Sequence, residues 1–261
     1  MASEKDTLVI ESADQLWRHN SRREFLRLLG IGGSVVLLPG VFAACGSDDP
    51  VGPGNGGTAT LNLGNDTGIL NYAYALEQLE AGFYSAVVAS STFGSLSAEI
   101  QEVMVDLRNH EVIHRDFFAR VLGSNAIGSL SLNTSTVATA TANRDSILRT
   151  AEQFEDLGVA AYNGAGKYLT DAANLLVAGK IVSVEARHAA AIRDIRQSLG
   201  ASGVARFAGD DVVNSMGLDV KLEPAAVLSR VAATNFVTTQ ISIGTNPAGT
   251  ATADAPPPTS I

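Results

Sequence analysis

Apolar residues recur with the period of an α-helix in four long segments of the chain. These segments are residues 68–90, 98–123, 144–169 and 171–200. In the first of them, one helical face carries Leu70, Ala73, Tyr74, Ala81, Tyr84 and Val88. A shorter segment follows at residues 223–236, with Pro224 in the first turn, where proline is favoured. The pattern predicts an all-α protein with a short C-terminal helical extension.

The links between the four long segments predict how the helices are connected. The first and second segments are joined by a short link, as are the third and fourth, so each pair is expected to be antiparallel. The link at residues 124–143 is long, small and polar, and shows no helical period. This connectivity is typical of a four-helix bundle with one long crossover. Residues placed to cap the first, second and fourth helices are Asp66 or Thr67, Ser97, and Thr170.

Residues 1–45 resemble an export signal. Arg22 and Arg23 precede the apolar run "LLGIGGSVVLLPGVFAAC", as in twin-arginine signals. A transmembrane helix is the alternative, but Gly30, Gly32, Gly33 and Pro39 interrupt the run. Cys45 ends the run at a site that resembles a lipoprotein cleavage site, so it is a candidate lipid acceptor; an unmodified cysteine is the other option.

The segments on either side of the predicted helices have an amino-acid composition that does not favour packing into a core. Residues 46–64 are rich in glycine and proline and predict a flexible tether after the signal. The bundle is expected at residues 65–200 and the C-terminal extension at 201–244. Residues 245–261 are expected to be disordered.

Charge and cysteine content exclude several classes of function. The chain of 261 residues carries a net charge of -9, which disfavours nucleic acid as a partner. Its one cysteine excludes an intramolecular disulfide and any site built from several thiolates. A bound metal would therefore be held by carboxylates and imidazoles, a donor set that favours iron, manganese or zinc.

A duplicated motif places such donors on all four helices. The second and fourth helices each carry Glu-x2-His, and the first and third each carry Glu-x6-Tyr. The motif residues are Glu111 with His114, Glu185 with His188, Glu77 with Tyr84, and Glu155 with Tyr162. One glutamate from each of two helices and a Glu-x2-His pair from each of the other two make six ligands for two metal ions in a bundle core. Four carboxylates also balance the charge of two divalent cations.

Other residues compete for roles at this site. Glu80 lies one turn after Glu77, but only Glu77 matches Glu155 in the repeat, because Gly158 stands where Glu80 would have its counterpart. Tyr84 and Tyr162 could donate hydrogen bonds to the ligands, relay electrons, or serve only in packing. His110 could support the site or guide metal entry, or it could be a partly exposed helix residue.

The stretches "LEQLEAGFY", "HEVIH", "FEDLGVAAY" and "VEARHAA" resemble the ferritin-like superfamily over residues 65–200. Within this superfamily, the amino-acid sequences of these stretches are most similar to those of bacterial ferritin-like domain proteins related to plant desiccation-related proteins. The resemblance implies a dinuclear iron or manganese centre held by Glu77, Glu111, His114, Glu155, Glu185 and His188. The spacing leaves open which glutamates bridge the two ions.

The resemblance implies redox chemistry with oxygen or peroxide, of catalase, peroxidase or ferroxidase type. A non-catalytic stress- or desiccation-associated protein on the same scaffold is the alternative, because fold does not fix function. The leader adds the expectation of a periplasmic or cell-envelope protein tethered to the membrane through lipid at Cys45. The sequence leaves the oligomeric state open, a homo-oligomer being one option.

Overall fold

The structure is a computed structural model that describes residues 57–201 and 208–247. The predicted export signal, Cys45, most of the tether and most of the C-terminal tail lie outside the described residues. The described elements are β1 (Thr58–Asn62), α2 (Asp66–Ala89), α3 (Ala98–Leu122), α4 (Thr134–Ala140), α5 (Arg144–Ala165), α6 (Ala172–Ser198), α7 (Pro224–Thr234) and β2 (Gln240–Thr245).

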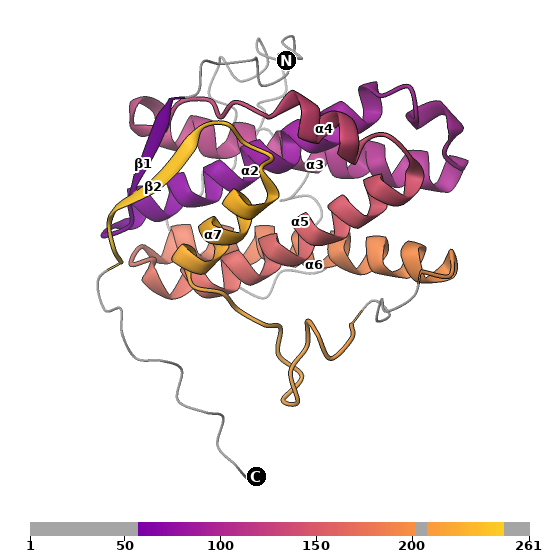
Figure 1. Cartoon of the computed structure of the whole chain (residues 1–261). Coiled ribbons are helices and arrows are strands. Elements are labelled where there is room, and N and C mark those ends of the chain that lie inside the picture. The colour runs from indigo at the N-terminus through magenta and orange to yellow at the C-terminus, as the bar shows by residue number, and fades with distance from the viewer. Residues whose placement is uncertain (1–56, 202–207, 248–261) are drawn as a thin grey trace, which may run out of the picture. The chain divides into compact units, whose positions relative to one another are not determined.

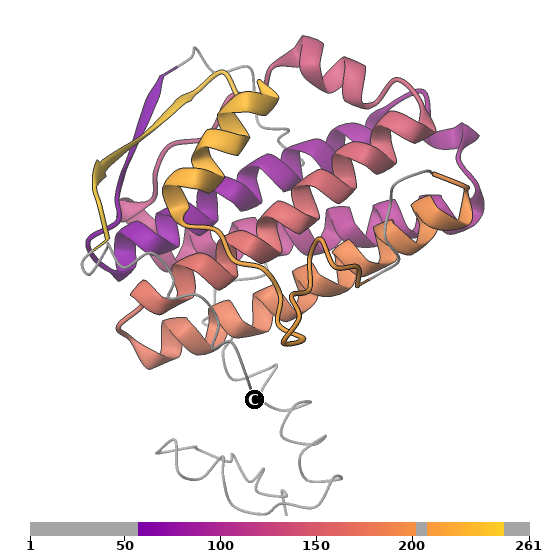
Figure 2. The same cartoon turned by 60° about the horizontal axis from the view of Figure 1, so that its bottom comes forward.

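Four long helices form the bundle that the sequence predicts. Helix α2 packs along α3, and α5 packs along α6 (Figures 1 and 2). Each pair is joined by a short link, and the long crossover connects α3 to α5. The prediction of a ferritin-like helical bundle with a C-terminal helical extension is confirmed, and α7 begins at Pro224 as expected. None of the described helices is long and apolar enough to cross a membrane.

Helix α2 is buried on nearly all sides rather than on one apolar face. The crossover lies along it and is held by two buried polar side chains. The Asn71 side chain accepts a hydrogen bond from the amide of Ile127 at 2.7 Å, and Gln78 accepts one from Leu130 at 2.8 Å. Buried amides in the crossover therefore find partners, as burial requires. The covering crossover explains why α2 carries so few charged residues.

The two ends of the described region form a small sheet that the sequence pattern does not predict. Strand β1 pairs in parallel with β2, with Thr58 opposite Gln240. Residues 58–62 belong to the segment expected to be a tether. They form a strand because Ala59 and Leu61 alternate with exposed residues and enter the core. The crossover also contains the short helix α4, which is too short to show a helical period.

Two of the expected helix caps lie at neighbouring residues. Ser97 caps α3 as expected, but Asn65 caps α2 and Asp171 caps α6. Asp66 instead accepts hydrogen bonds from the amides of Thr170 and Asp171, at 2.8 and 3.0 Å. It therefore ties the first turn of α2 to the first turn of α6, closing one end of the bundle.

The C-terminal segment packs directly against α5. The amide of Leu222 donates to the carbonyl of Ala160 at 2.9 Å. A Cβ atom at position 164 would lie 1.8 Å from the carbonyl oxygen of Leu222, so this close approach requires Gly164. Buried Arg193 of α6 pairs with Asp156 at 2.6 Å and Asp211 at 2.8 Å. The extension is therefore an integral part of the domain.

Candidate metal centre

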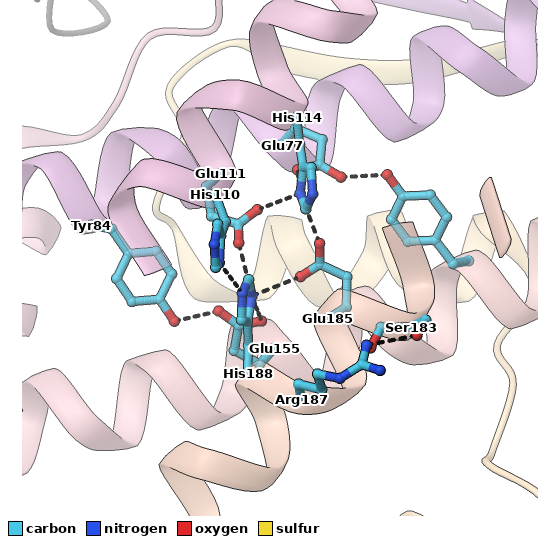
Figure 3. Close-up of polar contacts among 11 residues, drawn as sticks. Glu77, Tyr84, His110, Glu111, His114, Glu155, Ser183, Glu185, Arg187 and His188 are labelled. Carbon is cyan, nitrogen blue, oxygen red and sulfur yellow. Dashed lines mark hydrogen bonds and ion pairs between the residues drawn. The ribbon is translucent and has the colours of Figure 1, made fainter. Parts of the chain in front are cut away.

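The six residues singled out by the duplicated motif meet in the interior of the bundle (Figure 3). Glu77 comes from α2 and Glu155 from α5, while α3 and α6 each supply a Glu-x2-His pair. All four carboxylates are 0% exposed, and His188 is 4% exposed. The three-residue spacing places each glutamate beside its histidine on one helical face, and bundle packing turns all these faces inward.

The six side chains form two groups that share two glutamates. One group is Glu77, Glu111, His114 and Glu185, and the other is Glu111, Glu155, Glu185 and His188. Within each group, one ligand atom per residue lies within 4.8 Å of the others. The sequence did not indicate which glutamates two metal ions would share. In the structure, Glu111 and Glu185 belong to both groups, whereas Glu77 and Glu155 each belong to one group.

Both imidazoles present Nδ1 to the carboxylates. His114 Nδ1 lies 3.3 Å from Glu77 Oε2, 3.3 Å from Glu111 Oε2 and 3.0 Å from Glu185 Oε1. His188 Nδ1 lies 2.9 Å from Glu111 Oε1, 3.3 Å from Glu155 Oε2 and 3.4 Å from Glu185 Oε2. Each imidazole therefore stands at the centre of one group of carboxylates.

The two tyrosines of the motif hold the glutamates of the opposite hairpin. The Tyr84 hydroxyl on α2 donates to Glu155 Oε1 on α5 at 2.5 Å, and the Tyr162 hydroxyl on α5 donates to Glu77 Oε1 on α2. Burial, together with the facing carboxylates, raises the pKa of both hydroxyls well above the ordinary value. Both tyrosines therefore remain protonated donors that fix Glu155 and Glu77.

Without metal, the site is held together by protonated imidazoles. Burial works to lower the pKa of His114 and His188, but contacts with three carboxylates each raise it to about 12. Burial raises the pKa of Glu155 to about 8 and that of Glu77 well above its usual value. Burial also opposes ionisation of Glu111, yet contacts with His114 and His188 outweigh it and lower the pKa to about 2.

These shifts determine how the metal-free fold responds to pH. The folded pKa of each histidine exceeds its unfolded value of about 6.5. The stabilisation from these ion pairs is therefore complete below about pH 6.5 and is lost as the pH rises towards 12. The contribution of Glu111 to the stability of the fold depends on pH in the opposite direction. It is present above the unfolded pKa of Glu111 and is lost as the pH falls towards 2.

The donor set fits a pair of hard divalent cations. Six buried ligand atoms make no hydrogen bond and are held only by the ion-pair contacts described above: Glu77 Oε2, Glu111 Oε1, Glu155 Oε2, Glu185 Oε1, Glu185 Oε2 and His188 Nδ1. Buried polar atoms without hydrogen bonds are costly and call for an explanation, such as a role in binding an ion. All six belong to the residues that converge here, and two cations would satisfy them.

Glu80 is buried but stands apart from both groups. Its carboxylate lies against Gly158 of α5, where an added Cβ would be 3.1 Å from Oε1. Burial, followed by repulsion from Glu185 and Glu155, raises the pKa of Glu80 well above the ordinary value. Glu80 is therefore a neutral acid beside the cluster, in space that the glycine of the repeat leaves open.

His110, whose role the sequence left open, is an exposed helix residue that also contacts the site. Its Nδ1 lies 2.9 Å from His188 Nε2, and the two rings stack with centroids 5.1 Å apart. His110 is exposed on α3, so it links the buried His188 to the surface. Such a partner fixes the orientation of a ligating imidazole. The repeat has no counterpart of His110, because the equivalent position before Glu185 is Val184, and the sequence therefore did not predict which residue His110 would contact.

Comparison with known proteins agrees with this geometry. A family model described as a ferritin-like domain matches residues 65–198, about half of the chain, and the match contains all six clustered residues. No curated protein matches the chain.

The first prediction distinguishes Glu77 from Glu80. Glu77→Gln removes a ligand from one group only, so it should lower the metal content of the purified protein. Glu80→Gln is the matched control, one turn away and equally buried, and should leave metal content unchanged. Elemental analysis of the purified variants measures both. A loss of metal in Glu80→Gln with full occupancy in Glu77→Gln would contradict the assignment.

The second prediction concerns protons released on metal binding. At pH 7 the histidines are protonated and Glu155, with a pKa of about 8, is largely protonated. Ligation requires neutral imidazoles and ionised carboxylates, so loading should release at least two protons per chain, and affinity should rise with pH. Calorimetry with Mn²⁺ in buffers of different ionisation enthalpy counts these protons. Binding without proton release would show that the metal lies elsewhere.

Proposed function

The chain belongs to the ferritin-like domain family, and on that premise we propose that it holds two iron or manganese ions and uses them in redox chemistry with oxygen or peroxide. The observation that carries the proposal is the convergence of six buried ligand residues in two groups that share Glu111 and Glu185. Carboxylate oxygen and imidazole nitrogen suit these metals, and four carboxylates match the charge of two divalent ions.

The residues divide into three roles. Glu111 and Glu185 would hold both ions; Glu77 and His114 would complete one position, and Glu155 and His188 the other. Tyr84 and Tyr162 fix the carboxylates of Glu155 and Glu77, respectively, by hydrogen bonds. When bound, a pair of redox-active ions supplies electron exchange with oxygen or peroxide, chemistry that the side chains themselves lack.

Burial favours a small oxidant at the centre. The four carboxylates are 0% exposed, while the side chain of His114 is 12% exposed. The exclusion of bulk water strengthens the electrostatic interactions within the site. Oxygen and hydrogen peroxide are small enough to reach ligands enclosed in this way.

A structural role for the metal is the second candidate. It is favoured by the complete burial of the four carboxylates, since metal binding to such a cluster would stabilise the fold outright. In that case the protein would be a stress- or desiccation-associated scaffold without turnover. The two candidates differ in whether one loaded chain consumes many equivalents of oxidant.

The third prediction separates these candidates. Protein loaded with iron or with manganese should consume oxygen or hydrogen peroxide over many turnovers, faster than the same amount of free metal. An oxygen electrode and the absorbance of peroxide measure the rates. The double variant Glu111→Ala, Glu185→Ala loses both shared ligands and should lose metal and activity together. Metal binding that raises the melting temperature without turnover would favour the structural role.

We also propose that residues 1–45 direct export and that lipid at Cys45 tethers the domain to a membrane. The proposal rests on the twin arginines, the interrupted apolar run and the position of the one cysteine. A twin-arginine route carries folded proteins, so metal loading could precede export. Stable anchoring requires two or more acyl chains, because a single chain is marginal.

The fourth prediction tests this export. Cell fractionation should find the native protein in membranes and the Arg22→Lys, Arg23→Lys variant in the cytoplasm. The conservative change keeps the charge, so a charge effect alone does not explain retention. Cys45→Ala should be exported but released from the membrane. Membrane attachment that survives Cys45→Ala would indicate a retained apolar helix in place of a lipid anchor.

A further inference from the structure

A second internal feature lies between the cluster and one end of the bundle. It is an apolar cavity of about 230 Å³, to which all four long helices contribute. Its walls include Ala73 of α2, Phe118 of α3, Tyr162 of α5 and Ala178 of α6. For comparison, an apolar protein cavity of about 150 Å³ is sufficient to bind benzene. The cavity is therefore large enough for a small organic molecule.

The lining of the cavity matches an uncharged ligand. No charged side chain is among the lining residues, all of which belong to the described helices and the link after α5. Three lining residues carry a polar group. Asn174 donates to Asp66 at 2.9 Å and Tyr162 donates to Glu77, whereas the Tyr72 hydroxyl makes no hydrogen bond. A charged ligand would lose its hydration here without gaining a partner of opposite charge, which is strongly unfavourable.

The mouth of the cavity is also apolar. Phe117 and Val121, on one face of α3, line the cavity and are 36% and 50% exposed. Leu175 on α6 is 48% exposed and lies beside Gly166, another lining residue, since a Cβ there would be 3.7 Å from the leucine Cδ1.

Tyr162 connects the cavity to the cluster. Its side chain forms part of the wall, and its hydroxyl donates to Glu77 Oε1. The equivalent Tyr84 is 0% exposed and belongs to the main hydrophobic core, where it packs against Phe83. The Glu77 side of the cluster is therefore next to open apolar space, whereas Tyr84, which holds Glu155, is enclosed in the packed core.

We propose that this cavity binds a neutral, apolar organic molecule about the size of an alkylbenzene, in contact with Tyr162. The bound molecule packs against the tyrosine that fixes Glu77, and it therefore perturbs the metal position that Glu77 completes. The binding site stands on the cavity itself, whereas its effect on the metal rests on the proposed function. The chemistry of the lining also predicts selectivity: toluene binds, and benzoate, of similar size but charged, is rejected.

The test is calorimetric titration of the metal-loaded full chain with toluene, with benzoate as the matched ligand control. Toluene should bind saturably at one site, and benzoate should not. Ala178→Phe places a large side chain in the cavity and should raise the Kd for toluene at least about tenfold. Ala233→Phe makes the same change on α7, beside a different pocket lined by charged residues, and should leave the Kd unchanged.

A second variant guards against misfolding of the first. Val121→Lys changes a half-exposed residue at the mouth, so the fold should tolerate it, and the charge should weaken toluene binding. Toluene should also alter the visible absorption of the iron-loaded protein, and Tyr162→Phe should abolish that change while retaining toluene binding.

Three results would overturn the inference. These are no saturable binding of toluene, equal binding of benzoate, or unchanged affinity in both Ala178→Phe and Val121→Lys. Saturable binding without a spectral change would refute the link to the metal centre. Metal content, measured on the same samples, separates these failures from failure of the proposed function: a chain that holds two ions but ignores toluene refutes only the cavity proposal.

Discussion

Four carboxylates buried together are the constraint on which the rest of this domain depends. Glu77, Glu111, Glu155 and Glu185 are all 0% exposed, and mutual repulsion is strong at low dielectric. Burying an ionised carboxylate without compensation is costly. The structure compensates with two imidazoles of opposite charge and two tyrosine hydroxyls, all supplied by the same repeat. Divalent cations would neutralise the same carboxylates and displace protons from both imidazoles.

The surrounding fold can be understood as the means of keeping water from this cluster. Helix α2 would expose one side in a simple four-helix bundle. The crossover covers it, held by Asn71 and Gln78, and the C-terminal segment packs across α5 at Gly164. Both coverings place backbone amides inside the protein, and both provide them with hydrogen-bond partners. The extension beyond the four helices therefore covers part of α5, the helix that supplies Glu155.

The sequence predicted the features that follow from local periodicity. Glu111 and His114 share a helical face because they are three residues apart, and the repeat with Glu185 and His188 indicated a shared site. The β1–β2 pairing was not predictable in this way, because Thr58 and Gln240, which pair in space, lie far apart in the sequence. The contact of His110 with His188 depends on how α3 and α6 pack, and the sharing of Glu111 and Glu185 depends on where all four helices meet.

The two halves of the repeat supply equal ligands but unequal surroundings. The second half has Gly158 at the position where the first half has Glu80. The protonated side chain of Glu80 occupies the space beside Gly158, where this glycine has no side chain. The position completed by Glu155 and His188 has an exposed imidazole, His110, on its ligand. The position completed by Glu77 and His114 has instead Tyr162 and the apolar cavity. Polar access to one position and apolar space beside the other would place two ions with the same types of ligand in different surroundings, and the departures from the repeat would in this way give them different chemistry.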